Sequence, residues 1–568
     1  MTGDPVPENF GKKMDNLKFV LFVLFCLLLL VIWEAWQKDY GPKPETAAAQ
    51  QGKGPASGKP LQQDIPDDSG SRAETGAATT DDAPATADAP PTGQKITVVT
   101  DVIKLEIDTY GGDMRLVELL EYPISQDKPN VPFRLLTDIP PNLFVGQSGL
   151  LSGGGTAPNH QSVFTAETTE YRLQPGQDSL QVVLRWSDGA GIDVTKTYLF
   201  RRGRYLVELE QKVMNRSGRL WQGRQYAQLQ RKDVKDENKS MFIRTYTGGV
   251  IYNEEDKYEK ISFDDMAEQN LSLDAKGGWD AIIQHYFLAA WIPPADEINH
   301  YYTKALPDQR YIIGSQSEPK EVASGEDKIF QARFFAGPKL QHRLEKIAPG
   351  LELTVDYGWL TVVGKPIFWL LEKFHGLTGN WGWAIMCVTL VIKLLFFKLS
   401  EASYRSMAKM RKLQPRLQTL RERYGDDKQR MNMEMMSMYR TEKVNPLGGC
   451  LPILVQIPVF ISLYWVLIES VELRQAPFIL WITDLSAKDP YFVLPVLMAL
   501  SMYIQQRLNP TPIDPVQEKV MKMFPLVFGV FFMFFPAGLV LYWVVNNTLS
   551  ITQQWYITRQ IERADKAV

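Results

Sequence analysis

The stretch that most constrains this chain is residues 381–410, WGWAIMCVTLVIKLLFFKLSEASYRSMAKM, where a lysine stands inside an apolar run. Its first two-thirds is apolar enough to cross a bilayer, yet Lys393 lies within it. A charged side chain inside a span is costly unless it reaches the interface or faces water. Arg405 and Lys409 make the end of the stretch basic, which predicts that this end is cytoplasmic.

Charge and hydropathy indicate two different parts. The 568 residues carry a net charge of −3, which argues against general binding of nucleic acid. The mean hydropathy is slightly negative, so a large soluble part must be joined to a membrane part. The three cysteines, Cys26, Cys387 and Cys450, lie in or beside apolar runs, so we expect neither a disulfide framework nor a metal site.

The N-terminal region reads as an anchor followed by a linker. A basic flank and an apolar run without a small-residue cleavage site predict an uncleaved signal-anchor span at residues 1–40, with a cleaved signal peptide as the alternative. Residues 41–95 are rich in Ala, Pro, Gly, Thr, Asp and Gln. This composition predicts a disordered tether on the non-cytoplasmic side.

Residues 96–340 show the alternation of strands. Apolar and polar side chains alternate at 103–108, and Gly-containing turns occur at 110–112, 187–189 and 202–203. The pattern predicts an antiparallel β-sandwich. Because no catalytic or phosphate-binding motif occurs in it, a binding or scaffolding role is favoured, and an envelope enzyme is kept as an alternative.

The segments on either side of the second span both have the apolar spacing of a helix. In residues 341–380 this spacing predicts an amphipathic helix on the outer leaflet, or alternatively a helix packed against loops. Residues 403–443 carry eleven Lys or Arg and predict a cytoplasmic helical hairpin. Its methionines either form an adaptable surface for partners or hold the two helices together.

Further apolar runs complete a predicted bundle of five spans within residues 381–568. Two are at 451–468 and 491–504. The run 523–557 would be about 50 Å long as one helix, more than the ~30 Å hydrocarbon core. Its basic flanks and a turn at 536–538 predict two short spans instead. With the N-terminal anchor, the fold is a polytopic α-helical bundle of six spans plus the β-sandwich.

Polar residues inside these spans are the candidate site. If their helix faces converge, they line a hydrophilic pocket with one positive charge. The alternatives are a snorkelling lysine and plain hydrogen bonding between helices. No nucleotide loop, cofactor motif or catalytic set occurs, so we expect no enzyme activity and no cofactor. The residues are Thr389 and Lys393 in the second span, Gln456 in the third, and Tyr542, Trp543, Asn546 and Gln553 in the sixth.

Seven segments carry a resemblance to a known family. They are IWEAW after the anchor, LTVDYGWL before the second span, SMAKMRKLQP and YGDDKQR in the hairpin, and VNPLGGCLPILVQIPVF, VELRQAPFILWITDLSAKDPY and FPAGLVLYWVVNN in the membrane part. From the anchor to the last span the chain resembles the YidC family of membrane-protein insertases of the Gram-negative inner membrane. The sandwich and the tether match by position and character rather than by motif.

The resemblance implies a mechanism without nucleotide hydrolysis. Such proteins have a groove open to the cytoplasm and to lipid, with a basic residue that attracts acidic groups of a client. Lys393 falls at that position, where the family usually has arginine; lysine keeps the charge but loses the bidentate fork. Thr389, Tyr542 and Trp543 fall at groove-lining positions. The resemblance also implies an apolar surface along which the client segment moves into lipid, called the slide below. It is formed by Phe460, Pro525, Phe531 and Phe532.

The resemblance also implies location and partners. We expect a multi-pass inner-membrane protein with cytoplasmic termini and a large periplasmic domain. Its partners would be nascent membrane proteins, membrane lipids, the Sec translocon, and transiently the ribosome and the signal-recognition machinery, with no nucleic-acid binding of its own. The alternative is a transporter or channel, which would commonly show internal repeats. The unequal spans show none.

Overall fold

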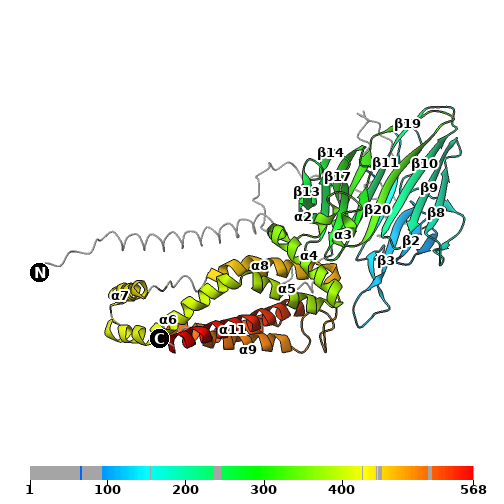
Figure 1. The fold of residues 1–568 in the computed structure, drawn as a ribbon. Coiled ribbons are helices and arrows are strands. Elements are labelled where there is room, and N and C mark those ends of the chain that lie inside the picture. Colours follow the sequence, from blue (N-terminus) through cyan, green and yellow to red (C-terminus); the bar gives the residue numbers. More distant parts are fainter. Residues whose placement is uncertain are drawn as a thin grey trace. The chain divides into compact units, whose positions relative to one another are not determined.

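The computed structural model describes residues 64–66, 93–153, 155–234, 245–424, 427–442, 444, 451–509 and 515–566. The predicted anchor at residues 1–40 and most of the predicted tether lie outside the described residues. In the described part, strands occupy the N-terminal half of the sequence and helices the C-terminal half (Figure 1).

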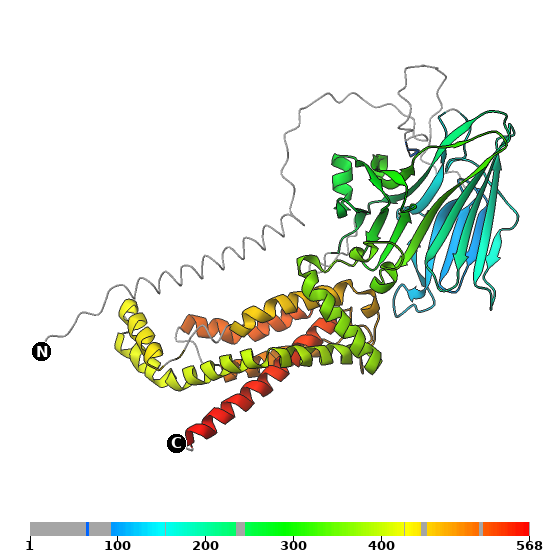
Figure 2. The same ribbon diagram turned by 45° about the horizontal axis from the view of Figure 1, so that its top comes forward.

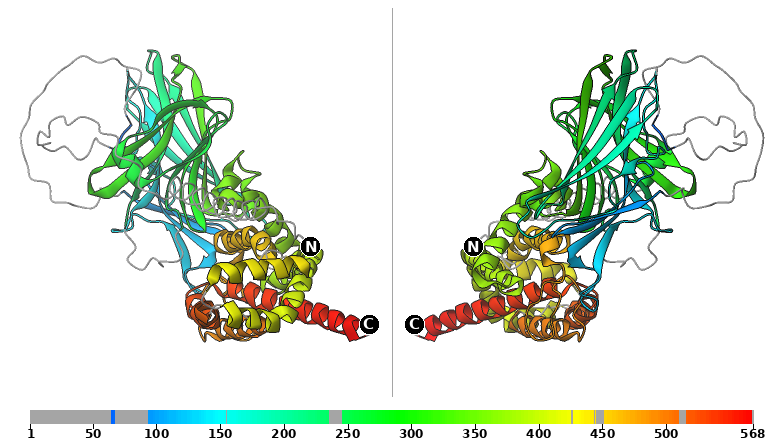
Figure 3. Two further views of the ribbon diagram at one scale, coloured as in Figure 1. Left: turned by 90° about the vertical axis from the view of Figure 1, so that its left-hand side faces the viewer. Right: turned by 90° about the vertical axis from the view of Figure 1, so that its right-hand side faces the viewer.

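The strands form two sheets, as the alternating sequence predicts, and those of each sheet lie side by side (Figure 3). Within the described residues the first sheet has 11 strands. In spatial order they are β14 (Ser272–Lys276), β17 (Ile298–Leu306), β18 (Arg310–Ser317), β11 (Trp221–Lys232), β5 (Phe144–Leu151), β3 (Asp113–Pro123), β2 (Ile103–Asp108), β1 (Lys95–Val99) and β7 (Glu170–Arg172), with β19 (Lys320–Val322) paired to β11 and β4 (Pro132–Leu136) to β3.

The second sheet has 9 strands among the described residues. They are β13 (Lys257–Ile261), β12 (Gly248–Asn253), β15 (Trp279–Gln284), β16 (Phe287–Ile292), β20 (Asp327–Pro338), β10 (Leu206–Asn215), β9 (Ile192–Arg201), β8 (Ser179–Ser187) and β6 (Thr165–Ala166). The paired strands are antiparallel in both sheets, apart from β1 and β7, which run parallel.

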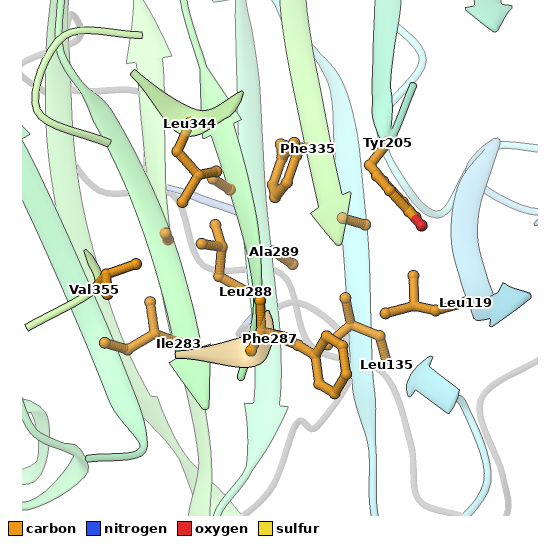
Figure 4. Packing of buried hydrophobic residues seen from close by; sticks show 14 of the residues in the cluster. Leu119, Leu135, Tyr205, Ile283, Phe287, Leu288, Ala289, Phe335, Leu344 and Val355 are labelled. Carbon is orange, nitrogen blue, oxygen red and sulfur yellow. The ribbon is translucent and has the colours of Figure 1, made fainter. Parts of the chain in front are cut away.

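Alternation along the strands builds the core between the sheets. In β9 every second residue from Ile192 to Phe200 is buried, which is the period of 2 that a strand with one covered face requires. Gly111 and Gly112 turn the chain between β2 and β3 with φ of 83° and 62°, a region that glycine enters without strain. Figure 4 shows part of the core, where Leu288 of β16 and Phe335 of β20 belong to one buried cluster.

Helices follow the last strand. The short helix α2 (Phe263–Glu268) and the turn η1 (Pro307–Gln309) lie within the strand region. After β20 come α3 (Gln341–Leu344), η2 (Leu351–Thr354), η3 (Gly358–Leu360), α4 (Thr361–Thr378), α5 (Trp381–Leu395), α6 (Phe397–Tyr424), α7 (Lys428–Thr441), α8 (Leu451–Glu469), η5 (Val471–Leu473), α9 (Val493–Leu508), α10 (Pro515–Phe532) and α11 (Ala537–Lys566), the last drawn in red (Figure 2).

Helix α5 is shorter than the predicted second span. Asn380 caps its start, accepting hydrogen bonds from the backbone N–H groups of Gly382 and Trp383. The helix ends at Leu395, four residues before the end at about Leu399 that the apolar run predicts, and α6 leaves it at a bend of 68°. Within the described residues, no single helix combines the length and apolarity of a membrane span, whereas α5 and α6 together do. The number of six spans therefore stays a prediction.

Two further predicted helical segments, the run 523–557 and residues 341–380, are described by the structure. The run 523–557 divides into α10 and α11, with the break at residues 533–536, which overlaps the predicted turn at Pro536. In α4, Ile367, Phe368 and Leu371 are buried against the protein, as the packing alternative expects. Trp359, Val362 and Trp369 stay exposed, so contact of this segment with a membrane stays a prediction.

The basic hairpin has its own small core. Leu413 and Leu417 of α6 pack with Val444, and Met435 and Met438 of α7 lie against them. These methionines hold the two helices together, whereas Met433 is 60% exposed. The hairpin therefore uses methionine for packing and also presents it on the surface.

Polar contacts join the strands to the helices. Lys339, just after β20, pairs at 3.2 Å with Glu469 at the end of α8, and both side chains are buried. His285 contacts the carbonyl oxygen of Ile468 through Nε2 at 2.9 Å, and Arg474 donates to the carbonyl oxygen of Pro123 at 2.7 Å. Burial, and next the charge of Lys339, lower the pKa of His285 to about 3, so this histidine is neutral at physiological pH.

Candidate groove between α5, α8 and α11

Lys393 is directed at a neighbouring helix. Its Nζ donates a hydrogen bond of 2.7 Å to Oγ of Ser550 on α11, and the lysine is half-buried. The Ser550 hydroxyl donates in turn to the carbonyl oxygen of Asn546 at 2.7 Å. The amine thus ends at a polar group of another helix, which differs from the snorkelling alternative.

Gln456 brings a third helix to the same place. Its side-chain amide, on α8, donates to Oδ1 of Asn546. Asn546 and Ser550 are four residues apart and share one face of α11. The predicted residues Lys393, Gln456 and Asn546 are therefore brought together, with the hydrogen bond between helices that one alternative expects.

Within the described part of the chain, the charge of Lys393 has no opposite charge beside it. Among the described residues, no carboxylate lies within 4.0 Å of its Nζ. A hydroxyl is a neutral acceptor, so the positive charge stays uncompensated within this part of the chain. Such a charge attracts an acidic group that comes within reach.

Thr389 and Tyr542 are near this cluster in sequence but are used differently. The Thr389 hydroxyl donates at 2.6 Å to the carbonyl oxygen of Ile385 on its own helix, and the side chain is 1% exposed. The Tyr542 hydroxyl is buried and makes no hydrogen bond of normal geometry with the described residues. Its ring stacks on Phe460 with 6.2 Å between centroids.

Trp543 and Gln553 lie apart from the Lys393 cluster in their contacts. The indole of Trp543 packs edge-on against Phe460 at 4.6 Å and against Phe532 at 5.5 Å. Gln553 donates at 3.2 Å to the carbonyl oxygen of Phe397, beside the bend between α5 and α6. The structure therefore places Trp543 with the residues predicted for the slide rather than with the polar ones.

The four residues predicted for the slide differ in exposure. Phe460 is half-buried, Pro525 and Phe532 are buried, and Phe531 is 39% exposed. Only Phe531 of the four shares in the exposed apolar face of α10. The other members of that face are Val520, Met521, Met523, Phe524, Leu526, Val527, Val530 and, just beyond the helix, Phe534.

Sequence reasoning missed Ser550, which holds the lysine. The signal was present, because Tyr542, Asn546 and Ser550 recur at a spacing of four, the spacing of one helix face. It also missed the hydrogen bond of 3.1 Å between Asn547 and Ser501, which joins α11 to α9.

Known proteins and protein families match nearly the whole length of the chain. The family described as YidC periplasmic domain matches residues 95–370, and the family described as 60Kd inner membrane protein matches residues 373–565. The membrane protein insertase YidC of Methylococcus capsulatus is 62% identical over 551 residues, which cover 97% of this chain and 99% of that protein.

A second relative agrees. The membrane protein insertase YidC of Thioalkalivibrio sulfidiphilus is 53% identical over 565 residues, covering 97% of this chain and 100% of that protein. A crystal structure of an active YidC insertase with its first transmembrane domain resolved gives a TM-score of 0.38 at 18% identity, covering 82% of this chain and 93% of that one. On the sequence matches, the chain belongs to the YidC family of inner membrane proteins, with the periplasmic domain of that family in its N-terminal half.

Proposed function

We propose that this protein inserts client transmembrane segments from the cytoplasm into the inner membrane, through a positively charged groove and without nucleotide. The relatives that cover its length are membrane protein insertases. The observation that carries the groove is Lys393, whose amine is held by Ser550 and has no carboxylate beside it among the described residues.

The client would be drawn in by its charge and released by its apolar surface. An acidic group in the segment to be translocated approaches Lys393 because the attraction between unit charges is several kcal/mol at about 4 Å in a medium of intermediate polarity. The apolar segment then moves along the exposed side chains of α10, of which Phe531 is one. Hydrocarbon solvates such a segment better than water does.

The proposed topology follows the basic segments of the sequence. It has six spans, both termini and the hairpin α6–α7 in the cytoplasm, and the sandwich in the periplasm. The domains proposed are an anchor at 1–40, a tether at 41–95, the sandwich at 96–340, an interfacial segment at 341–380 and the core at 381–568. The hairpin is the surface we propose for the ribosome and the signal-recognition machinery, and the Sec translocon is a further proposed partner.

Photocrosslinking to a stalled single-span client tests this function. The crosslinker is placed at position 393, 456 or 531, and, as a control, at Leu377, which is 80% exposed on α4. We expect adducts with the client from the first three positions and none from Leu377. A lack of adducts at all three positions, while the client is inserted normally, contradicts the groove and favours the transporter alternative.

A further inference from the structure

The outer face of the 11-stranded sheet carries a buried polar cluster. In β11, Ala227 and Leu229 belong to the core between the sheets, whereas Tyr226 and Gln228 alternate with them and point the other way. An outer face normally meets water, which suits polar side chains. Here both Tyr226 and Gln228 are 0% exposed, so other parts of the chain cover them.

Residues 64–66 are part of that cover. The Asp64 carboxylate lies 3.1 Å from Nε2 of His160 through Oδ2 and accepts from the Gln161 side chain at 3.1 Å through Oδ1. The Asp64 carbonyl oxygen accepts from Nε2 of Gln228 at 3.0 Å. The next carbonyl oxygen, that of Ile65, accepts from Nζ of Lys304 at 3.5 Å. Sandwich side chains thus bind one carboxylate and two successive backbone carbonyls.

His160 is oriented toward the carboxylate by Tyr226. The Tyr226 hydroxyl accepts the backbone N–H of His160 at 2.9 Å and lies 2.6 Å from Nδ1 of the same residue. These two contacts fix the ring so that Nε2, its other nitrogen, faces the Asp64 carboxylate.

Gln228 is oriented in the same way. Its Oε1 accepts from the Tyr302 hydroxyl at 2.7 Å, and its Nε2 donates at 2.9 Å to Oε1 of Gln147. One N–H of the amide then remains, and the Asp64 carbonyl accepts it. Residues 64–66 therefore both cover this part of the sheet face and accept the amide N–H that Gln228 has left.

The bound carboxylate is ionised. Burial opposes its charge, but the neighbouring His160 imidazole, followed by Arg310, holds the pKa of Asp64 below its ordinary value. The site therefore binds an anionic side chain together with the backbone carbonyl oxygens of its own residue and of the next one.

We propose that His160, Gln161, Gln228 and Lys304 form a peptide-binding site for an acidic segment, and that residues 64–66 of the chain itself occupy it. The site thus attaches the middle of the predicted tether to the sandwich. Occupancy of the site would shorten the free part of the predicted tether from residues 41–95 to residues 41–63.

Occupancy can be measured in the full-length protein in detergent. A photocrosslinker at position 63 should give an intramolecular adduct with the sandwich, located by mass spectrometry. We expect Asp64→Asn to lower the yield of this adduct severalfold. Lys304→Ala, which changes the site instead of the bound segment, should also lower the yield. Asp81→Asn, a matched change in the same predicted tether, should leave it unchanged. An equal adduct in Asp64→Asn and in the parent protein overturns the proposal.

Binding in trans gives a second, independent readout. A labelled decapeptide of residues 60–69 is titrated with the parent protein and with the Asp64→Asn variant, and its binding is followed by fluorescence anisotropy. The parent protein should bind it weakly, because its own segment competes at an effective concentration of the order of 1 mM. Asp64→Asn should bind it about tenfold more tightly. Equal affinity for the two proteins, or no binding to either, contradicts a peptide site with an internal occupant.

Discussion

Lys393 on α5 and Ser550 on α11 are joined by a hydrogen bond of 2.7 Å, which the amine donates to the serine hydroxyl. The serine fixes where the charge lies without neutralising it. Charge and position can therefore be altered separately, which the first two predictions use.

Removing the charge should affect clients according to their own charge. Lys393→Arg keeps the charge and should stay active, whereas Lys393→Ala should lower insertion of clients with acidic outer segments about tenfold. This corresponds to a net loss of about 1.4 kcal/mol, which is less than the gross attraction because bringing the two charges together also removes water from them. The measurement is protease protection of the translocated segment in cells. A matched client with those acids changed to Asn or Gln should be insensitive to Lys393→Ala. Full activity of Lys393→Ala with the acidic client would leave the lysine without a role in capture.

Removing the hydroxyl should have a smaller effect. Ser550→Ala deletes one hydrogen bond to a charged group, worth about 1.5–3 kcal/mol, part of which water or a rotated lysine recovers. We expect insertion of the acidic client to fall by a few-fold. Thr548→Ala is the control, because its hydroxyl donates at 2.8 Å only within its own helix, to Val544, and should change nothing. Equal losses in the two variants would mean that the fall comes from helix stability.

The buried pair Lys339–Glu469 should be sensitive to loss of one member. Lys339→Ala leaves the Glu469 carboxylate buried without its counter-charge, which costs about 3–5 kcal/mol. The control is Lys320→Ala, which breaks the more exposed pair with Glu297 at 2.8 Å and should cost at most about 1 kcal/mol. Thermal unfolding of the purified protein in detergent compares them. Similar shifts in melting temperature for both variants would contradict a strong buried pair.

Asp280 predicts a pH dependence of the sandwich. Burial raises the pKa of this carboxyl to about 8, and neither oxygen makes a hydrogen bond of normal geometry with the described residues. Because the folded state holds the proton, the free energy of unfolding should fall as pH rises from about 4 to about 8. Asp280→Asn should therefore raise the urea midpoint more at pH 8.5 than at pH 6, followed by tryptophan fluorescence.

A matched acid separates this effect from a general loss of negative charge. Asp274 is 75% exposed and pairs with His300 at 2.7 Å, so Asp274→Asn should shift the midpoint little at either pH. The same gain for Asp280→Asn at both pH values would show that Asp280 does not change its protonation over this range.

Local patterns predicted much of the fold. The alternation at residues 103–108 coincides with β2, and the glycines at 111 and 112 turn the chain after it. The order of strands could not be predicted, because neighbours such as β1 and β7 are far apart in sequence. The bend at Phe396 also had no signal, since neither proline nor glycine stands at it.

The candidate site was predictable in its polar residues more than in its geometry. Lys393, Asn546 and Gln456 are connected by hydrogen bonds through Ser550, because polar groups inside apolar helices need partners, while their role as a client-binding groove stays a prediction. Pro525 is buried and Trp543 packs against Phe460 and Phe532, which depends on how the helices are rotated and is not encoded in a short pattern. Residues 64–66 carry no pattern of their own, and their contacts are known only from the fold.

The pair Lys339–Glu469 defines where the sandwich can be exchanged for another domain. The last strand of the sheet, β20, ends at Pro338, and the lysine follows directly. A deletion of residues 102–331 keeps Lys339 beside Glu469, so it tests whether the envelope-enzyme alternative applies without leaving a lone charge in the helical part. A deletion carried ten residues further would remove the lysine and damage the core that it was meant to spare. In a chimera with a foreign outer domain, the junction should therefore lie before Lys339, so that the lysine is kept. Otherwise the foreign domain must supply a positively charged side chain beside Glu469 at the end of α8.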